Sequence, residues 1–152
     1  MTTATHHLSG LPDPVEHGEF YENVAMLRFF AFCIDAAIVT ALTGLLLLAS
    51  VFALIWVLPF LALVVSIAYR AIAVKTFAAT LGMKWLGLEI REGNGLPIES
   101  PTGTWHAVLF SLQFIIPILL LVNMVLIAVT KFGQGLHDLP LGTTVIRRPV
   151  LR

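Results

Sequence analysis

Charged residues are scarce in this chain. Only 12% of its 152 residues are Asp, Glu, Lys or Arg, whereas 58% are hydrophobic. Soluble domains carry about 25% charged residues, which keep their surface in contact with water. The shortage of charge, together with a mean hydropathy of +0.92, indicates an integral membrane protein whose main partner is the lipid bilayer.

Neither sign of charge is in excess. Nine basic residues balance nine acidic ones, and the formal net charge is +0. A nucleic-acid-binding protein needs a positive surface to attract phosphates. We therefore expect no nucleic-acid partner.

The chain also lacks the residue patterns of catalytic and metal sites. Its one cysteine, Cys33, lies in an apolar run and is expected to be a small buried hydrophobe. There is no nucleophile elbow, no Cys/His pair, no metal-spaced His or acidic cluster and no phosphate-binding glycine loop. His6 and His7 stand in a polar arm and are expected to belong to a disordered tail. We expect a protein that is not an enzyme and has no cofactor and no metal site.

The first 23 residues have no basic stretch ahead of an apolar core, and they carry four acids, Asp13, Glu16, Glu19 and Glu22. This pattern is unlike a secretory signal. We expect residues 1–23 to form a flexible arm that is retained.

Residues 29–68 are almost wholly apolar, with Asp35 as their single charge. As one helix they would measure about 60 Å, twice the hydrocarbon thickness of a bilayer. We therefore predict two transmembrane helices at about 29–49 and 51–73, joined by a very short turn into an antiparallel hairpin.

Several residues of this hairpin have expected local roles. Tyr69 and Arg70 are expected to anchor the second helix at the headgroup boundary, and Pro59 to kink it in its first half. A stripe of small side chains suited to close helix packing recurs at every fourth residue, at Ala36, Thr40 and Gly44.

Between the hairpin and the next apolar run the hydrophobic period changes. Apolar and basic residues at 76–86 have the spacing of a short helix in the membrane interface. Residues 88–98 then alternate around a Gly-Asn-Gly turn, which predicts a small β-hairpin outside the bilayer. Near the end of the chain, residues 143–148 predict a short strand.

The third apolar segment, residues 105–130, contains Pro117 near its middle. One kinked, tilted helix of about 39 Å would be long enough to cross the bilayer. It would place five basic residues on one side of the membrane and four on the other, which agrees poorly with the positive-inside rule. A break at Pro117 with a re-entrant return would place all nine bases on the cytoplasmic side. With either alternative, the predicted fold is an all-α membrane protein of about three transmembrane or re-entrant segments, with a short interfacial helix and a small β-hairpin.

Three charged residues carry a family resemblance. Arg28 heads the first helix, Asp35 follows seven residues later, and Asp138 stands after the last apolar segment. This order resembles the RDD family of small bacterial membrane proteins, which is named for one arginine and two aspartates. The resemblance covers residues 24–148 and leaves 149–152 as a tail. The closing stretch LHDLPLGTTVI is similar to the family's final motif at His137, Asp138, Gly142 and Thr143.

The chain also departs from the family pattern. Where relatives have Thr-Pro-Gly-Lys, this chain has Thr80, Gly82 and Lys84, with the base displaced by one position, and it lacks the arginine that usually precedes the last apolar segment. The resemblance implies a multi-pass protein of the bacterial inner membrane. It implies no settled biochemical activity.

Asp35 is the most informative residue, because it lies about 9 Å into the first helix, where an aspartate costs about 2.5–3.5 kcal/mol to insert. Asp35 is either a protonatable or cation-binding group, as in proton-coupled transport, or a hydrogen-bond acceptor for a neighbouring helix. The candidate partners for the second role are Thr40, Thr43, Ser66, Gln113 and Asn123.

Arg28 and Asp138 each have two possible roles. Arg28 either anchors its helix at the cytoplasmic headgroups or partners an acid, and Asp138 either caps a turn or forms an ion pair with Arg28. That pair requires the re-entrant third segment, since three full crossings would place the two residues on opposite faces of the bilayer. His137 is expected to be interfacial and solvated.

Two hypotheses for function remain. The first is a non-enzymatic accessory protein that binds a membrane-protein partner or itself as a homo-oligomer. The second is an oligomeric exchanger of monovalent cations and protons with Asp35 as the carrier group.

Overall fold

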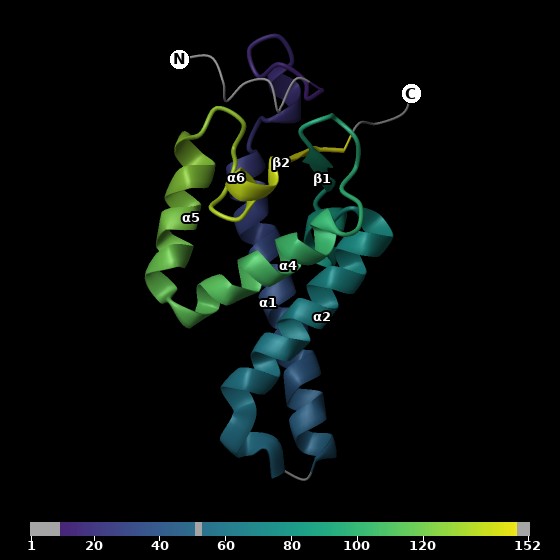
Figure 1. Cartoon of the computed structure of the whole chain (residues 1–152), viewed down its shortest axis with the longest axis vertical. Coiled ribbons are helices and arrows are strands. Elements are labelled where there is room, and N and C mark those ends of the chain that lie inside the picture. The colour runs from purple at the N-terminus through teal and green to yellow at the C-terminus, as the bar shows by residue number, and fades with distance from the viewer. Residues whose placement is uncertain (1–9, 51–52, 149–152) are drawn as a thin grey trace.

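The computed structural model describes residues 10–50 and 53–148, and its largest feature is an antiparallel hairpin of α1 (Val24–Ala49) and α2 (Leu58–Phe77) (Figure 1). The apolar stretches that contain these helices, Gly18–Ala49 and Ala53–Phe77, are long and apolar enough to cross a membrane. The predicted hairpin is therefore present, with α2 ending at Phe77 rather than at residue 73.

The second helix starts differently from the prediction. A 3-10 turn, η3 (Ala53–Val57), precedes α2, and Pro59 lies in the first turn of α2. The expected kink at Pro59 is wrong, because a proline in the first turn removes an N–H that has no helical acceptor there. Pro59 thus begins the helix instead of bending it.

The third apolar segment is broken. It consists of α4 (Thr102–Leu112), η4 (Gln113–Ile115) and α5 (Pro117–Val129), and Ile116 between them has an extended backbone. Figure 1 shows α4 crossing the hairpin and α5 returning toward the end of the molecule where α4 begins. The 13 residues of α5 measure about 20 Å, less than the hydrocarbon thickness of about 30 Å. Of the two alternatives for this segment, the structure has the one that breaks at Pro117.

The predicted interfacial helix is shorter than expected. Phe77 still belongs to α2, the chain turns at Ala78 with a positive φ of 51°, and α3 covers only Leu81–Trp85. The Thr80 side chain accepts a hydrogen bond from the Met83 N–H and so fixes where α3 begins.

The sheet consists of β1 (Leu88–Glu92) and β2 (Thr143–Arg147), paired antiparallel with Leu88 opposite Arg147. The predicted strand near the C-terminus is present. The predicted hairpin is present only in part: the Glu92 and Ile98 N–H groups donate to the Leu96 and Ile90 carbonyls, and Arg91 forms a bridge with Pro97, but residues 96–98 form no strand. Proline cannot donate to a ladder, whereas the β-branched residues of β2 suit a strand, so β2 pairs along the whole of β1.

The core lies at the end of the molecule that holds the sheet. Its buried side chains come from α1, α2, α3 and both strands, and include Ala31, Val74, Met83, Ile90 and Val145. The other end of the hairpin exposes apolar side chains, with Leu45 64% and Trp56 92% exposed. This division fits a hairpin whose far half is surrounded by lipid.

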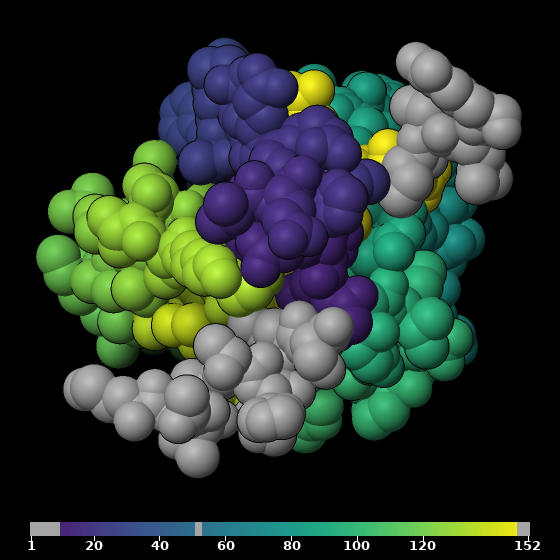
Figure 2. Space-filling model, turned by 90° about the horizontal axis from the view of Figure 1, so that it is seen from above, coloured from purple at the N-terminus to yellow at the C-terminus, as the bar shows by residue number. Residues whose placement is uncertain are grey.

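Residues 10–23 and α6 (Asp138–Leu141) lie at the same end as the sheet (Figure 1). Figure 2 looks onto this end and shows the purple N-terminal segment across its middle. The Gly10 N–H donates to the Gly93 carbonyl, and the Arg147 Nε donates to the Glu22 carbonyl. The flexibility of the arm stays a prediction. His6 and His7, the hairpin turn at 51–52 and the tail at 149–152 lie outside the described residues.

Candidate functional site

A buried ion pair joins the start of α1 to the C-terminal segment. Arg28 Nη2 donates to Asp138 Oδ2 at 2.7 Å, and Arg28 Nη1 donates to the Gly133 carbonyl at 2.8 Å. Both side chains are buried. Of the two roles predicted for each of these residues, the structure therefore has the ion pair between Arg28 and Asp138. The contact requires both residues to lie on one side of the molecule.

Asp138 is the centre of a dense hydrogen-bond network. Oδ2 also accepts from the Gly135 N–H at 2.8 Å, and Oδ1 accepts from Thr143 Oγ1 at 3.1 Å. Burial alone would raise the pKa of Asp138, but the Arg28 guanidinium holds it well below its usual range. The carboxylate is thus ionised at neutral pH. The short α6 begins at Asp138 and ends at Gly142, whose φ of 61° turns the chain so that Thr143 meets Asp138 again.

Asp35 has a different set of partners. Its Oδ1 accepts from Tyr69 Oη at 2.7 Å and from the Gly82 N–H at 2.9 Å, and its Oδ2 lies 3.5 Å from Arg70 Nη1. Arg70 is buried, and its guanidinium carbon lies 4.0 Å from the centroid of the Phe110 ring. A second buried ion pair, Asp35–Arg70, therefore stands beside the first.

This pair corrects two expectations. Tyr69 and Arg70 do not anchor α2 at a headgroup boundary, because both hold Asp35. None of the donors expected for Asp35 contacts it in the described part of the chain. The sequence does contain a signal for the pairing. Asp35 lies 14 residues before the end of α1 at Ala49, Arg70 lies 12 residues after the start of α2 at Leu58, and an antiparallel hairpin brings such positions together.

The other motif residues support these two pairs. Gly82 packs so closely on α1 that a Cβ would collide with the Ala31 carbonyl and the Asp35 carboxylate. Lys84 Nζ lies 3.4 Å from the centroid of the Phe77 ring and takes part in neither ion pair. Thr80 caps α3.

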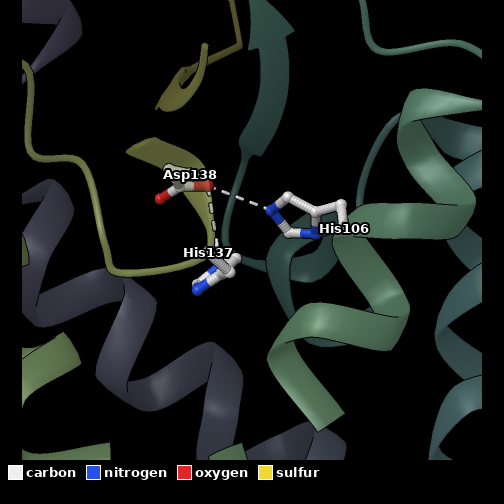
Figure 3. Close-up of side chains that lie close together, drawn as sticks. All are labelled: His106, His137 and Asp138. Atoms are coloured by element: carbon white, nitrogen blue, oxygen red, sulfur yellow. Dashed lines mark hydrogen bonds and ion pairs between the residues drawn. The ribbon is translucent and has the colours of Figure 1, made fainter. Parts of the chain in front are cut away.

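Two buried histidines lie beside Asp138 of the first ion pair. His106 Nε2 lies 3.0 Å from Asp138 Oδ1, and His137 Nε2 lies 3.5 Å from the same oxygen (Figure 3). The expectation that His137 is solvated is wrong: it is 2% exposed, and this burial lowers its pKa well below the usual value. His106 was not predicted from the sequence as a site residue. Its one signal is its position beside the place where relatives carry an arginine.

A cavity of about 210 Å³ lies between the two ion pairs. Polar side chains from both pairs reach it, and its remaining walls are apolar side chains of α1, α4 and α5. The polar lining consists of Arg28, Asp35, Arg70, His106, Asn123 and His137. One cavity thus contacts Arg28 of the first ion pair and both members of the second.

The model of the RDD family matches residues 24–142, and this range contains both ion pairs. The chain belongs to the RDD family. No curated protein and no solved structure matches it. In this RDD protein, the arginine and the two aspartates of the family name do not form one cluster. Arg28 pairs with Asp138, and Asp35 pairs with Arg70, a residue outside the named three.

Proposed function

We propose that this RDD protein is a non-enzymatic accessory protein of the bacterial inner membrane, which receives a transmembrane helix in a groove of its hairpin. The groove, which we call the hairpin groove, has a volume of about 510 Å³ and lies between α1, α2 and η4. It is the observation that carries the proposal. Its walls include small side chains that allow another helix to approach closely, namely Ala36, Thr40, Ala62 and Ser66.

Within residues 10–50 and 53–148, the chain has no helix of its own that fills the hairpin groove. Its third apolar segment turns back at Pro117, and the far half of the hairpin exposes large apolar side chains. A helix in lipid gains association energy mainly from close packing, which the small side chains favour. The predicted stripe of Ala36 and Thr40 thus lies where a partner helix would pack.

The occupant that we propose is α1 of a second copy. Most homo-oligomers are closed and symmetric, and two-fold dimers are the commonest. In such a dimer the same face of α1 meets its own copy. The expectation that Cys33 is buried is wrong, because its side chain is exposed. It lies seven residues before Thr40, about 20° from the same helical face.

The single cysteine provides the test. Oxidation of native membranes should link two copies through Cys33 into a species of twice 16.6 kDa. Ala36→Leu, which fills the hairpin groove, should reduce this product at least about fivefold. Ala41→Leu is the matched control, because Ala41 lies about 140° around α1 from Ala36 and should leave the product unchanged. Absence of a linked dimer, or equal linking in both variants, would contradict self-assembly through this groove.

We further infer a multi-pass topology with the sheet on the cytoplasmic side and a re-entrant third segment. Between Arg28 and Arg70 the sequence carries no base, so the far end of the hairpin is free of positive charge. The Arg28–Asp138 contact supports the same topology. A fluorescent protein fused after Arg152 should fold and fluoresce, whereas activity of a periplasmic phosphatase fused there would contradict this orientation.

The exchanger remains a second candidate because of one observation. Asp35 Oδ2 is buried without a hydrogen-bond partner and belongs to a side chain that lines the cavity of about 210 Å³. A cation or proton that binds this oxygen would compete with Arg70 Nη1, which lies 3.5 Å away. This candidate predicts exchange that Asp35→Asn abolishes while insertion and assembly persist.

A further inference from the structure

His106, His137 and Asp138 bring three metal-binding side chains to one point. They come from α4, from the chain just before α6 and from the first residue of α6, and all three are buried. One ligand atom from each lies within 4.8 Å of the others. Figure 3 shows both imidazole rings beside the same carboxylate.

The hydrogen bonds of Asn123 decide which nitrogen of His137 carries hydrogen. Asn123 Oδ1 accepts the Leu136 N–H at 2.7 Å, so it is the oxygen, not the amide nitrogen, that lies 3.1 Å from His137 Nδ1. Two acceptors would repel, and Nδ1 must therefore donate. Gln113 Nε2, which lies 3.2 Å from the same nitrogen, would oppose a second donor there. A half-turn of this amide gives up the long 3.4 Å bond from Nε2 to the Leu109 carbonyl and lets the unpartnered Oε1 accept the Nδ1 hydrogen.

This tautomer leaves His137 Nε2 with a bare lone pair. The atom is buried, has no hydrogen-bond partner and lies 3.5 Å from the ionised Asp138 carboxylate. Two electron-rich atoms at this distance in a buried site repel each other, and a cation bound by both would turn this repulsion into attraction. A neutral imidazole held through Nδ1–H by an oxygen is also the form in which histidine binds metals.

We propose that this cluster binds one first-row transition-metal ion of the zinc class, with His106 Nε2, His137 Nε2 and Asp138 Oδ1 as its ligands. A tetrahedral ion with ligands at about 2.0–2.2 Å separates them from each other by about 3.3–3.6 Å. The distances of 3.0 and 3.5 Å from Asp138 Oδ1 to the two nitrogens need only small adjustment, whereas the widest separation in the set, at most 4.8 Å, has to shorten when the ion binds. Two imidazoles and one carboxylate are a ligand set that zinc accepts, with a fourth position left open.

The surroundings suit this assignment. Arg28 holds Oδ2 of Asp138, which keeps the carboxylate ionised and leaves Oδ1 for the metal. Both histidines line the cavity of about 210 Å³, so the fourth ligand comes from that space. Because Arg28 and Asp138 cancel each other's charge, a divalent ion leaves the site positive, and we expect the fourth ligand to be an anion such as hydroxide or chloride.

The chain allows a clean binding test, because it has five histidines. Replacing His6, His7 and His17 by Gln leaves the two cluster histidines alone, and a tag without histidine avoids competing sites. This triple variant, purified in detergent and stripped with chelator, should bind one equivalent of Zn²⁺ in calorimetry with micromolar or tighter affinity. Co²⁺ should give the visible absorption of a four-coordinate site. Zn²⁺, but not Mg²⁺, should also raise Tm by about 5 °C or more.

Further variants test the ligand set in the same background. His106→Gln keeps a donor for Asp138 but removes a ligand, and should weaken Zn²⁺ binding about 100-fold or more. Asn123→Leu leaves all three ligands in place, removes the acceptor of Nδ1–H and should weaken binding about 10–100-fold. Absence of Zn²⁺ binding, of the Co²⁺ spectrum and of the Tm rise in the triple variant would overturn the proposal. Unchanged binding in His106→Gln would overturn the ligand set.

Discussion

The substitution Asp138→Asn tests whether the Arg28–Asp138 ion pair stabilises the fold or is only a surface contact. The asparagine has nearly the same shape, and its amide oxygen can still accept hydrogen bonds, but it leaves the buried charge of Arg28 without a counterion. Removing one partner of a buried pair costs about 3–5 kcal/mol. A protein of this size loses about 2–4 °C of Tm per kcal/mol, so we expect Tm to fall by roughly 6–20 °C.

Thermal unfolding in detergent, followed by the fluorescence of the three tryptophans, measures this change. Asp13→Asn is the matched control, because Asp13 is half exposed and lies 3.9 Å from Lys131. Such a surface pair contributes about 0–1 kcal/mol. The double variant Arg28→Met/Asp138→Asn removes the buried charge but keeps an oxygen that accepts from Gly135 or Thr143, and it should recover much of the lost Tm. A fall for Asp138→Asn no larger than that of Asp13→Asn would refute the assignment.

Two further substitutions test the second ion pair and the helix contact beside it, each by the same unfolding assay. Gly82→Ala places a methyl group of α3 against α1 and should cost about 1–3 kcal/mol. Gly44→Ala in α1 meets open space and should be neutral or stabilising, and equal effects would contradict the close packing. Arg70→Gln leaves the Asp35 carboxylate without its cation and should lower Tm by several degrees. Lys75→Gln, at an exposed position of the same helix, is the control and should lower Tm less. A smaller fall for Arg70→Gln than for this control would contradict the pairing.

The hairpin could be predicted because it depends on local quantities, and the broken third segment is one of two alternatives that such quantities leave open. The length of the apolar run at 29–68 requires two spans, and Pro117 supplies the break. The strand at 143–148 has β-branched residues and could be predicted for the same reason. Its pairing with β1 could not, because a partner some 50 residues away leaves no mark on local periodicity.

The site residues also fall into those that the sequence predicts and those that only the tertiary structure reveals. Arg28, Asp35 and Asp138 stand out as charges in or near apolar segments, and the family pattern names them. From the sequence, Arg70 is expected at the headgroup boundary of the membrane. The antiparallel packing of α1 and α2 instead brings its guanidinium to Asp35. His106 becomes visible as a site residue only when the broken third segment brings α4 to Asp138.

Ion flux tests most directly whether the buried charges are structural or carry ions. If Asp35 and Arg70 hold helices together and the protein acts by binding a partner helix, as we propose, the protein itself should conduct no exchange. Proteoliposomes with an imposed pH gradient should then show the same dissipation on addition of Na⁺, K⁺ or Li⁺ as protein-free vesicles. Dissipation by the wild-type protein that Asp35→Asn abolishes, with insertion unchanged, would contradict the structural role and establish Asp35 as a transport site.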